Sequence, residues 1–542
     1  MSDGTFFVID KETSIKTEKV VIDKSYKYSD ICGFPAWQRR IMVIFVLNFT
    51  SMRKSLLAIF CLFISLAVHS QEWKAEWDMS ARLLGGTGPY LPFWQRTGYD
   101  GLIPNSSSIL VMGGGNVQKQ TAGGFIFEAG TNLVASLVSR NPLDDAKVSG
   151  LVDRLYLSGS WRMLHMDIGM KPREKDFGDI SITGGDMIYT RNARNIPGVN
   201  MWSDWIYLNK GHHVGIKGNY AHYQFIDNRF VKNTMLHNKA VSIKISPVKA
   251  FEIEAGLEHW VQWGGCSPRF GDLPSSFSDY IRVFLSKEGG DDSPDAEKEN
   301  VLGNHLGRQY YRLKYNNPAF ALTFQYDIPY EDRSGLRWWG FPDGVWTLMM
   351  NRNERRAWVT DVVYEFIHTV WQSGPLHDRP ATEDELAKQD PDDYYYGRKV
   401  LGGMDCYFNN GIYKSGWTNY GRVIGLPLMI PYAPGEDGSI DNIASTRVLG
   451  HHFGVSGVLA DKVPYTFKAT YSRQYGDYRI KDDFFATHPW QLSFAFECDL
   501  DKALTGLPVS FSLGGYCDIG ELYKDSVGLT LRVGYGGSRR IR

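Results

Sequence analysis

Cysteine is scarce in this chain, and its few copies follow no metal-binding or redox spacing. The 542 residues include six cysteines, with no Cys-x-x-Cys pair and no Cys/His ligand spacing, so we expect no structural zinc site. Cys498 and Cys517 lie on consecutive predicted strands, too far apart along them to form a disulfide. For Cys266 and Cys406, which fall in two long predicted loops, a disulfide stays open.

An excess of charge of one sign is also absent, as are the motifs of common enzymes. There are 59 Lys and Arg residues against 60 Asp and Glu residues, a balance that predicts no nucleic-acid partner. We find no Gly-x-Ser-x-Gly elbow or other nucleophile signature. Carboxylates are plentiful, but no spacing singles out the pair that a glycoside hydrolase needs. The chain is therefore not predicted to be an enzyme, and no cofactor or metal is predicted.

Only one long apolar run occurs, and it lies toward the N-terminus. The run over 56–68 follows a basic Met-Arg-Lys start and ends in a small-residue cleavage signal before Gln71. This pattern predicts a secretory signal peptide over 52–70, because the run is too short for a membrane-spanning helix. We expect residues 1–51 to result from a start codon assigned too early, with a true long leader as the alternative. Residues 71–542 are predicted to form a single domain.

Aromatic residues and alternating stretches are what the chain is rich in. Aromatic residues make up 14% of it, with 16 Trp and 30 Tyr, and outer-membrane barrels concentrate such residues in two interfacial girdles. Val527 to Tyr535 alternates apolar with polar residues, as a strand with one apolar face does. This C-terminal strand favours the closing strand of a barrel, with a strand of a soluble sandwich as the alternative. Similar alternation runs from Phe125 to Leu133, Leu164 to Lys171, Val241 to Ser246, Phe320 to Asp327, Tyr465 to Ser472 and Leu492 to Glu497.

The connections between these stretches discriminate between the two folds. Short connections alternate with long ones, and such asymmetry is typical of outer-membrane barrels. Counting strands from Trp73, we predict an all-β transmembrane outer-membrane β-barrel of about 18 antiparallel strands. It would have short periplasmic turns and long extracellular loops, be surrounded by outer-membrane lipid, and be a monomer. The short connections lie near 121–124, 209–212, 316–318, 353–356 and 461–464, and the long ones near 85–105, 172–202, 263–307, 329–343 and 372–445.

A barrel of this size encloses a lumen that carries water unless it is filled. On one predicted strand, Glu252, Glu254 and Glu258 would face the lumen, and on the next strand so would Arg312 and Lys314. We expect these charges to pair and to structure the interior. A substrate path through the lumen is the alternative.

Three motifs follow one another at the predicted outer segments. Residues 91–99 read Leu-Pro-Phe-Trp-Gln-Arg-Thr-Gly-Tyr, residues 182–197 are rich in Gly, Asn and Arg, and residues 256–265 end a strand. With the strand plan from Trp73 to Tyr535, they resemble the capsule assembly Wzi family in the form found in the Bacteroidetes. The resemblance implies an outer-membrane barrel of about eighteen strands whose outer loops fold over the lumen. It also implies a lectin-like role that holds capsular polysaccharide at the cell surface.

The chain departs from the enterobacterial pattern of this family, which has a helical bundle at the periplasmic N-terminus. Here the mature chain is expected to enter its first strand at once, from Trp73 to Leu84. Contacts with an export machine are therefore not carried over to this chain.

The candidate glycan-binding residues are aromatic and polar residues of the predicted outer segments. Sugars offer C–H faces that stack on aromatic rings and hydroxyls that need fixed polar partners. For each tryptophan, the alternative is a girdle or loop-packing residue. The candidates are Trp94, Asp186, Asn192, Arg194, Trp263, Trp338 and Trp339, with Trp202, Trp205, Trp417 and the cluster Tyr394–Tyr396 as further aromatic groups.

These observations predict a lectin-like barrel of the outer membrane that binds and retains capsular or surface polysaccharide during capsule assembly. A channel or transporter for glycans or other solutes is the alternative. An outer-membrane enzyme is a third class, which the missing motifs disfavour.

Overall fold

The computed structural model describes most of the chain from Trp73 onward and two short strands before it. β1 (Val8–Ile9) pairs antiparallel with β2 (Ile15–Lys16), in a unit over Met1–Leu56 that is separate from the unit over Leu57–Arg542. The predicted signal peptide over 52–70 lies outside the described residues. These are 8–9, 15–16, 73–139, 147–299, 301–331, 336, 338, 340, 341–372, 379–388, 395–396, 398–400, 406–435, 439–478, 482–500, 506 and 509–541.

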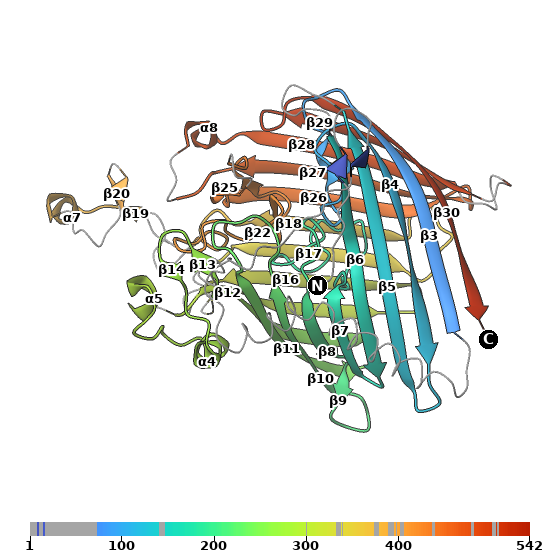
Figure 1. The fold of residues 1–542 in the computed structure, drawn as a ribbon, viewed down its shortest axis with the longest axis horizontal. Coiled ribbons are helices and arrows are strands. Elements are labelled where there is room, and N and C mark those ends of the chain that lie inside the picture. Colours follow the sequence, from blue (N-terminus) through green and yellow to red (C-terminus); the bar gives the residue numbers. More distant parts are fainter. Residues whose placement is uncertain are drawn as a thin grey trace. The chain divides into compact units, whose positions relative to one another are not determined.

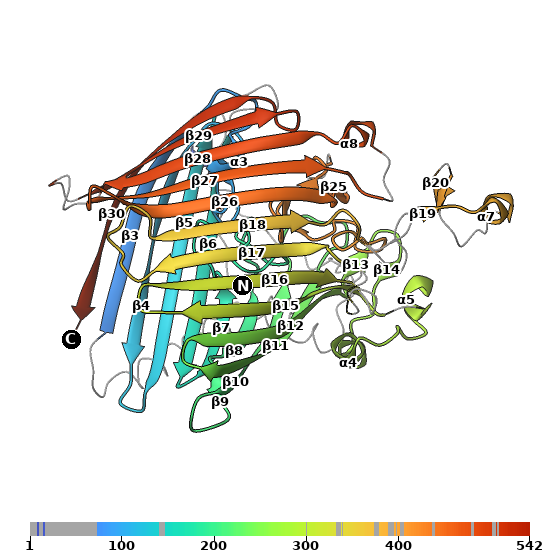
Figure 2. The ribbon, with the colours of Figure 1, turned by 180° about the vertical axis from the view of Figure 1, so that it is seen from behind.

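The second unit is a closed antiparallel β-barrel (Figures 1 and 2). β8 and β9 both pair with β10 and act as one interrupted strand, so the described wall has the eighteen strands that the sequence predicts. The strands are β3 (Trp73–Gly86), β4 (Ser108–Gln120), β5 (Phe125–Val138), β6 (Lys147–Trp161), β7 (Leu164–Met170), β8 (Gly198–Ser203), β9 (Ile206–Tyr207), β10 (Val214–Gln224), β11 (Met235–Val248), β12 (Phe251–Trp263), β15 (Asn304–Asn316), β16 (Phe320–Tyr330), β17 (Gly344–Arg352), β18 (Asp361–His368), β26 (Val448–Leu459), β27 (Val463–Gln474), β28 (Trp490–Leu500), β29 (Ser510–Gly520) and β30 (Ser526–Ile541).

The C-terminal strand closes the barrel, as its alternation predicts. β30 pairs with β29 on one side and with the first wall strand, β3, on the other, so that Trp73 lies opposite Ile541. A sheet that closes on itself leaves no row of unpaired backbone groups, which would cost several kcal/mol each in lipid. The observed strand is longer than the predicted one and reaches six residues beyond Tyr535.

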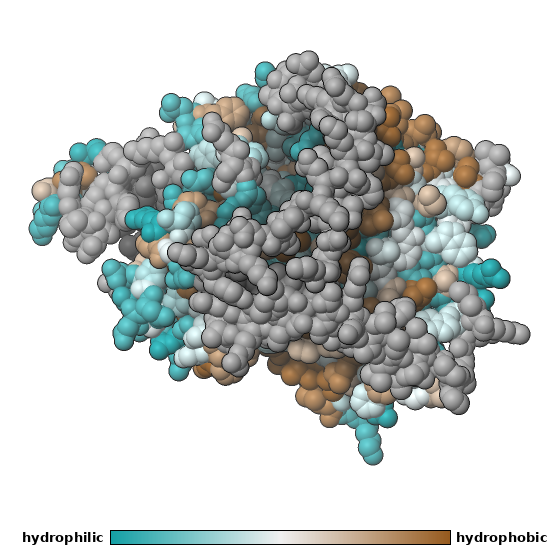
Figure 3. Space-filling model, viewed as in Figure 1, coloured by the Kyte–Doolittle hydropathy of each residue, from teal (hydrophilic) through white to brown (hydrophobic). Residues whose placement is uncertain are grey.

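The outer face of the wall is apolar and exposed. On β30, Leu529 is 69% exposed and its neighbour in the same row, Val527, is 52% exposed. Figure 3 shows hydrophobic side chains gathered over the outer wall where β3 and β4 run. Exposed apolar surface this extensive is rare on monomeric soluble proteins but normal on barrels that face acyl chains. Other outward residues of the same kind are Met79, Leu83, Leu133, Leu157, Ile168, Ile243, Ile253, Leu313, Phe324, Leu348 and Phe496.

Short and long connections alternate around the barrel and therefore lie at opposite ends, here called the short-turn end and the long-loop end. The connections over 121–124, 208–213 and 317–319 are tight, as predicted, and so is the connection over 249–250, which the sequence did not single out. The long ones carry small elements: α3 (Phe93–Arg96), β13 (Cys266–Ser267), β14 (Gly271–Asp272), α4 (Phe277–Leu285), α5 (Asp295–Glu299), β19 (Arg379–Pro380), α7 (Glu383–Lys388), β20 (Tyr395–Tyr396), β21 (Lys399–Val400), β22 (Thr418–Asn419), β23 (Arg422–Val423), β24 (Ile430–Pro431), β25 (Ile443–Ser445) and α8 (Asp483–Ala486).

In the part of the chain that the structure describes, no helix is both long and apolar enough to cross a membrane.

Cys266 and Cys406, the pair for which a disulfide stayed open, are not bridged to each other. The Cys406 thiol instead donates to Asp477 Oδ2 at 2.6 Å. Cys517 lies opposite Phe494, four residues along β28 from Cys498. The two cysteines are therefore too far apart to form a disulfide, as the sequence predicts.

Three of the long connections fold inward and fill the lumen. The segments 87–107, 171–197 and 406–447, together called the plug, supply the apolar residues of one buried cluster. The wall supplies the rest of that cluster from inward-facing positions, which include Leu236, Trp260, Leu306, Val345, Ile367, Ala495 and Tyr516. The cluster therefore reaches across the lumen from β10–β12 to β28 and β29. Each fully buried aliphatic or aromatic side chain contributes about 1.5–3 kcal/mol to such a core.

Candidate functional site

Segment 171–197 is attached to the wall by buried carboxylates. Glu365 of β18 accepts hydrogen bonds from Ser181 Oγ at 3.0 Å, from the Ile182 backbone N–H at 2.7 Å and from Thr183 Oγ1 at 2.5 Å. Asp327 of β16 accepts one from the Met187 backbone N–H at 3.0 Å. A buried carboxylate that keeps several donors is stable only in the folded arrangement that supplies them. The segment is thus fixed in place.

Charge pairs inside the lumen strengthen this attachment. Arg308 Nε lies 2.8 Å from Glu258 Oε2, and its Nη1 lies 3.0 Å from Asp327 Oδ2 and donates to the Gly185 carbonyl at 2.7 Å. Burial alone would raise the pKa of Asp176, but Arg312 and Lys217 outweigh it and lower that pKa to about 2. The lumen charges therefore structure the interior.

The predicted lumen pairs are partly those observed. Arg312 pairs with Glu254 at 3.3 Å, as expected from their opposed positions on β12 and β15. Glu252 pairs instead with Lys244 of β11 at 3.7 Å, although Lys314 lies opposite it in the sheet. Neighbours on both sides of a strand compete for the same carboxylate, and the sequence does not say which one wins.

Segment 406–447 packs on segment 171–197. The Trp417 indole N–H donates to the Ile188 carbonyl at 2.7 Å, and Asn192 Nδ2 donates to the Val423 carbonyl at 2.9 Å. Gln262 Nε2 of β12 donates to the Gly416 carbonyl at 3.0 Å. The two segments and the wall are therefore joined by backbone-directed hydrogen bonds around an apolar centre.

Two of the candidate tryptophans are core residues of the folded loops. Trp94 is 3% exposed, and its indole N–H donates to Thr470 Oγ1 at 3.0 Å. Trp263 is 2% exposed and packs with Met235, Val283 and Tyr280. Neither ring presents a face to solvent. Both positions are those of loop-packing residues.

The polar candidates divide into structural and surface residues. Asp186 is buried and accepts hydrogen bonds from the backbone N–H groups of Ile188 and Tyr189. Asn192 is buried between two plug segments. Arg194 remains half-exposed, and its guanidinium lies 4.3 Å from the ring centre of Tyr420. Of these three, only Arg194 offers its side chain to a ligand.

The remaining tryptophans are scattered. Trp338 is 43% exposed and packs on Tyr311 and Tyr326 against the outer wall, apart from the plug. Trp339 and Tyr394 lie outside the described residues. Trp417 is buried in the plug. The placement of Trp202 and Trp205 in or beside an outer segment is wrong. Trp202 lies opposite His165, next to the two-residue turn between β6 and β7, and Trp205 precedes β9 and the tight connection 208–213, both at the short-turn end.

Tyrosine rings and guanidinium groups gather on the long-loop side of the plug, a cluster that the sequence did not single out. The Arg96 guanidinium lies 4.7 Å from the ring centre of Tyr523 and 5.8 Å from that of Tyr90. Tyr523 belongs to the connection between β29 and β30 at the long-loop end. Arg422 Nη1 donates to the Arg96 carbonyl at 3.2 Å. We name this set the arginine–tyrosine surface: Tyr90, Arg96, Arg194, Tyr420, Arg422 and Tyr523.

The arginine–tyrosine surface combines exposed rings with partly buried guanidinium groups. Tyr90 is 37% exposed, and Tyr420 is 40% exposed at the tip of the β22–β23 hairpin. Burial and the neighbouring Arg96 lower the pKa of Arg422 to about 9. The buried Nε atoms of Arg96 and Arg194 have no hydrogen-bond partner among the described residues. Flat rings beside guanidinium groups suit a ligand with apolar faces and many acceptor oxygens.

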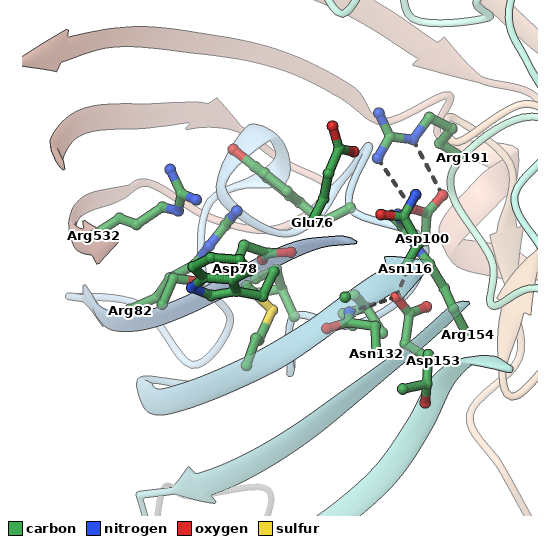
Figure 4. A pocket seen from close by; sticks show the side chains of 18 of the residues that line it. Glu76, Asp78, Arg82, Asp100, Asn116, Asn132, Asp153, Arg154, Arg191 and Arg532 are labelled. Carbon is green, nitrogen blue, oxygen red and sulfur yellow. Dashed lines mark hydrogen bonds and ion pairs between the residues drawn. The ribbon is translucent and has the colours of Figure 1, made fainter. Parts of the chain in front are cut away.

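Two polar cavities lie on the other side of the plug. The first, called the β3–β6 cavity, has a volume of about 470 Å³ and reaches from Glu76 and Asp78 of β3 to Tyr99 and Asp100 of the plug (Figure 4). Glu76 is only three residues from the start of β3 at the short-turn end. The cavity therefore lies between the plug and that end.

The second, called the β7–β12 cavity, has a volume of about 550 Å³. Trp202 and Trp205 line it, and the ammonium groups of Lys217 and Lys244 lie 4.9 Å and 4.7 Å from the ring centre of Trp205. Among the described residues, no group of three or more His, Cys, Asp or Glu side chains is arranged to hold a metal ion. The β7–β12 cavity is thus lined mainly by polar side chains, together with the indole rings of Trp202 and Trp205.

These features define a class of protein: a closed β-barrel whose lumen is filled by its own loops. No family model matches the sequence, and none of the curated proteins matches it. The structure is similar to that of Wzi, an outer membrane protein involved in group 1 capsule assembly in Escherichia coli and a carbohydrate-binding β-barrel. The two chains are 12% identical over 84% of this chain and 83% of that one, with a TM-score of 0.49.

Two further solved structures of Pseudomonas aeruginosa proteins are similar. OccK5 (OpdH) is 8% identical over 86% of this chain and 98% of its own, with a TM-score of 0.42. OprD is 9% identical over 86% of this chain and 95% of its own, with a TM-score of 0.40.

Proposed function

We propose that this chain is an outer-membrane barrel that binds and retains capsular or other surface polysaccharide through its long-loop face. The observation that carries the proposal is the arginine–tyrosine surface, which lies on the long-loop side of a filled lumen. The long-loop end faces the cell exterior in this proposal, and the short-turn end faces the periplasm. The apolar outer wall and the closed hydrogen-bonded sheet support a place in lipid.

The chemistry of the surface supports a glycan ligand. The exposed rings of Tyr90 and Tyr420 offer flat faces for the C–H side of a sugar ring. The guanidinium groups of Arg96 and Arg194 offer donors to hydroxyl, ring and carboxylate oxygens. Arg422, whose two Nη groups donate to the Arg96 and Ile103 carbonyls and to Asn105, adds positive charge beside them. The filled lumen supports binding at the surface over passage through the barrel. The proposal assigns no catalytic residue, since the six residues of this surface include no serine, cysteine or carboxylate.

A channel or transporter remains the second candidate, and the two cavities on the short-turn side are what favours it. A conduit needs the plug to move, whereas a glycan-binding barrel works with the plug in place. Conductance across a planar bilayer therefore separates the two functions.

The experiment is complementation of a deletion strain with single variants of the surface. In Tyr420→Ala and Arg194→Gln cells, we expect polysaccharide to be made but shed into the medium, with a several-fold loss of the cell-bound fraction. Tyr420→Phe keeps the ring and Arg194→Lys keeps the charge, so these variants serve as matched controls. Heat-modifiable migration on gels checks that each barrel has assembled.

Binding in vitro completes the test. Detergent-solubilised wild-type protein is titrated with polysaccharide extracted from the same cells, and Tyr420→Ala is expected to bind at least tenfold more weakly, which corresponds to about 1.4 kcal/mol. Unchanged retention in cells together with unchanged affinity would refute the assignment of this surface.

A further inference from the structure

The β3–β6 cavity is lined by an equal number of acidic and basic side chains. Figure 4 shows them facing one space from β3, β6, β30 and the plug. The carboxylates are Glu76, Asp78, Asp100 and Asp153, and the guanidinium groups are Arg82, Arg154, Arg191 and Arg532. Overall neutrality conceals an uneven distribution, because the two ends of the cavity differ in how their charges are paired.

At the plug end, the charges are paired. Arg191 Nε and Nη2 donate to the two oxygens of Asp100 at 3.1 Å and 3.0 Å. Arg154 Nε lies 3.3 Å from Asp153 Oδ2, which also accepts a hydrogen bond from Asn132 Nδ2 at 2.9 Å. The dashed lines of Figure 4 mark such contacts. The carboxylates and guanidinium groups at this end are therefore held in place. Their remaining lone pairs and N–H groups are suited to the hydroxyls of a ligand.

At the β3–β30 end, two guanidinium groups stand side by side. Arg82 and Arg532 lie directly opposite each other on the paired strands β3 and β30. Within the part of the chain that the structure describes, neither forms an ion pair or a hydrogen bond, and both Nε atoms are buried without a partner. Arg82 only lies over the Tyr99 ring, 4.8 Å from its centre. Like charges directly opposite in a sheet destabilise it.

The nearby carboxylates are engaged elsewhere. Glu497 accepts hydrogen bonds from the Tyr99 and Tyr516 hydroxyls, each at 2.6 Å. Asp499 accepts one from Ser512 at 2.5 Å. Glu76 pairs with Lys74 at 2.5 Å. Glu497 and Asp499 both keep their negative charge, because a hydroxyl donor is neutral. Of the charged side chains that line the cavity, Arg82, Arg532 and Asp78 form no ion pair with a described residue.

We propose that the β3–β6 cavity is a binding site for an acidic sugar of the hexuronate class, with its carboxylate held between Arg82 and Arg532. Two guanidinium groups offer paired N–H donors to the two oxygens of one carboxylate. The hydroxyls of the sugar meet Asn116, Asn132 and the carboxylates at the plug end. A carboxylate would add one negative charge beside Asp78, whereas a phosphate would add close to two.

The size and position of the cavity agree with this ligand. A volume of about 470 Å³ falls within the range of small-molecule sites. The site lies on the short-turn side of the plug, so its ligand arrives from the opposite direction to a ligand of the arginine–tyrosine surface. The inference therefore does not rest on the proposed surface function, and either can fail without the other.

The test is isothermal titration calorimetry of the full-length protein in detergent, with sodium D-glucuronate as the probe. We expect D-glucose to bind at least tenfold more weakly than glucuronate, and Arg532→Gln and Arg82→Gln each to weaken glucuronate binding at least tenfold. Arg539→Gln is the matched control, because Arg539 is on the same strand but on the outward face, opposite Ala75. Its affinity for glucuronate should equal that of the wild type.

The unfolding temperature distinguishes an arginine that binds the ligand from one that only stabilises the fold. Because Gln at position 532 removes a like-charge pair, Arg532→Gln should unfold at the same or a higher temperature than the wild type. A purely structural arginine would show the reverse, lower heat stability with no change in ligand affinity, and that result would overturn the proposal. Equal affinity for glucose and glucuronate, or no glucuronate binding at millimolar concentrations, would overturn it as well. Tighter binding of glucose 6-phosphate than of glucuronate would overturn the hexuronate assignment.

Discussion

Trp94 is a residue whose aromatic ring stabilises the plug from within. It packs on Phe93 and on His452, whose ring centre lies 5.0 Å from its own, and it bonds Thr470. Truncating a buried tryptophan to alanine costs about 3–5 kcal/mol. We predict that Trp94→Ala makes the plug sensitive to limited proteolysis at a lower temperature than in the wild type. Trp338→Ala, at an exposed ring, should change this temperature little, and equal resistance of the Trp94 variant would contradict the role.

At the scale of residues, the sequence predicted which segments hold the tryptophans better than it predicted whether their rings face solvent or the core. Trp94 and Trp263 were assigned to long connections, and they lie there or at the strand edge beside one. Whether a loop tryptophan faces solvent or the core depends on partners such as Thr470, which is 376 residues away. No local pattern carries that information. The arginine–tyrosine surface was missed for the same reason, although the basic and aromatic content of 90–96 was a usable signal.

The C-terminal strand is the element whose outward face can be tested most directly. Leu531 of β30 lies between Leu513 of β29 and Leu83 of β3, and all three are exposed on the outer wall. An arginine at the middle of a lipid-facing strand costs about 2–4 kcal/mol. We predict that Leu531→Arg lowers the urea concentration at which the barrel unfolds in lipid vesicles. Leu531→Phe is the control and should assemble normally; equal stability of both variants would argue against a lipid-facing wall.

The connection 264–303 is predicted to loosen as pH rises, because of Glu297 in α5. This side chain is 4% exposed, its Oε1 accepts the Gly303 N–H at 3.1 Å and its Oε2 has no described partner. Burial raises the pKa of Glu297 from 4.5 to about 7. Between pH 4.5 and about 7, Glu297 is therefore protonated in the folded connection and ionised in the unfolded connection. The stability of the connection is complete below pH 4.5 and falls as pH rises through 7.

The measurement is hydrogen exchange of residues 264–303 at pH 5 and pH 8, corrected for the intrinsic rates. Protection should be lower at pH 8, by at most about 3 kcal/mol for a shift of this size. Glu297→Gln should show the same protection at both values, because it cannot ionise. A wild-type connection with pH-independent protection would mean that Glu297 is solvated.

At the scale of elements, alternation and loop length were sufficient to predict the wall. Period-2 stretches such as 241–246 and tight connections such as 317–319 lie where the sequence placed them, since a lipid-facing sheet imposes its pattern on every strand. The plug was not predictable in this way. Its apolar residues, such as Ile188 and Leu426, follow no period because irregular segments bury side chains in every direction.

For the whole molecule, closure creates neighbours that no linear pattern reveals. Arg82 and Arg532 are separated by 450 residues, yet the register of β3 with β30 places them opposite each other. Both fall on the polar face of their strands in the sequence, so the face was predictable. The pairing was not, because it depends on which strands meet at the seam.

The plug is expected to block passage through the lumen. The plug core includes Trp417, Val423 and Ile424 in its centre, and segment 406–447 is fixed by the Trp417 bond to Ile188. Replacing residues 412–424 with a Gly-Ser linker removes this centre and leaves the wall strands intact. We predict little conductance for the wild type in planar bilayers and a clear increase for the variant, with heat-modifiable migration on gels as the assembly control. Wild-type conductance already equal to that of the variant would show that the plug moves aside in the membrane, and the channel function would then be favoured over surface retention.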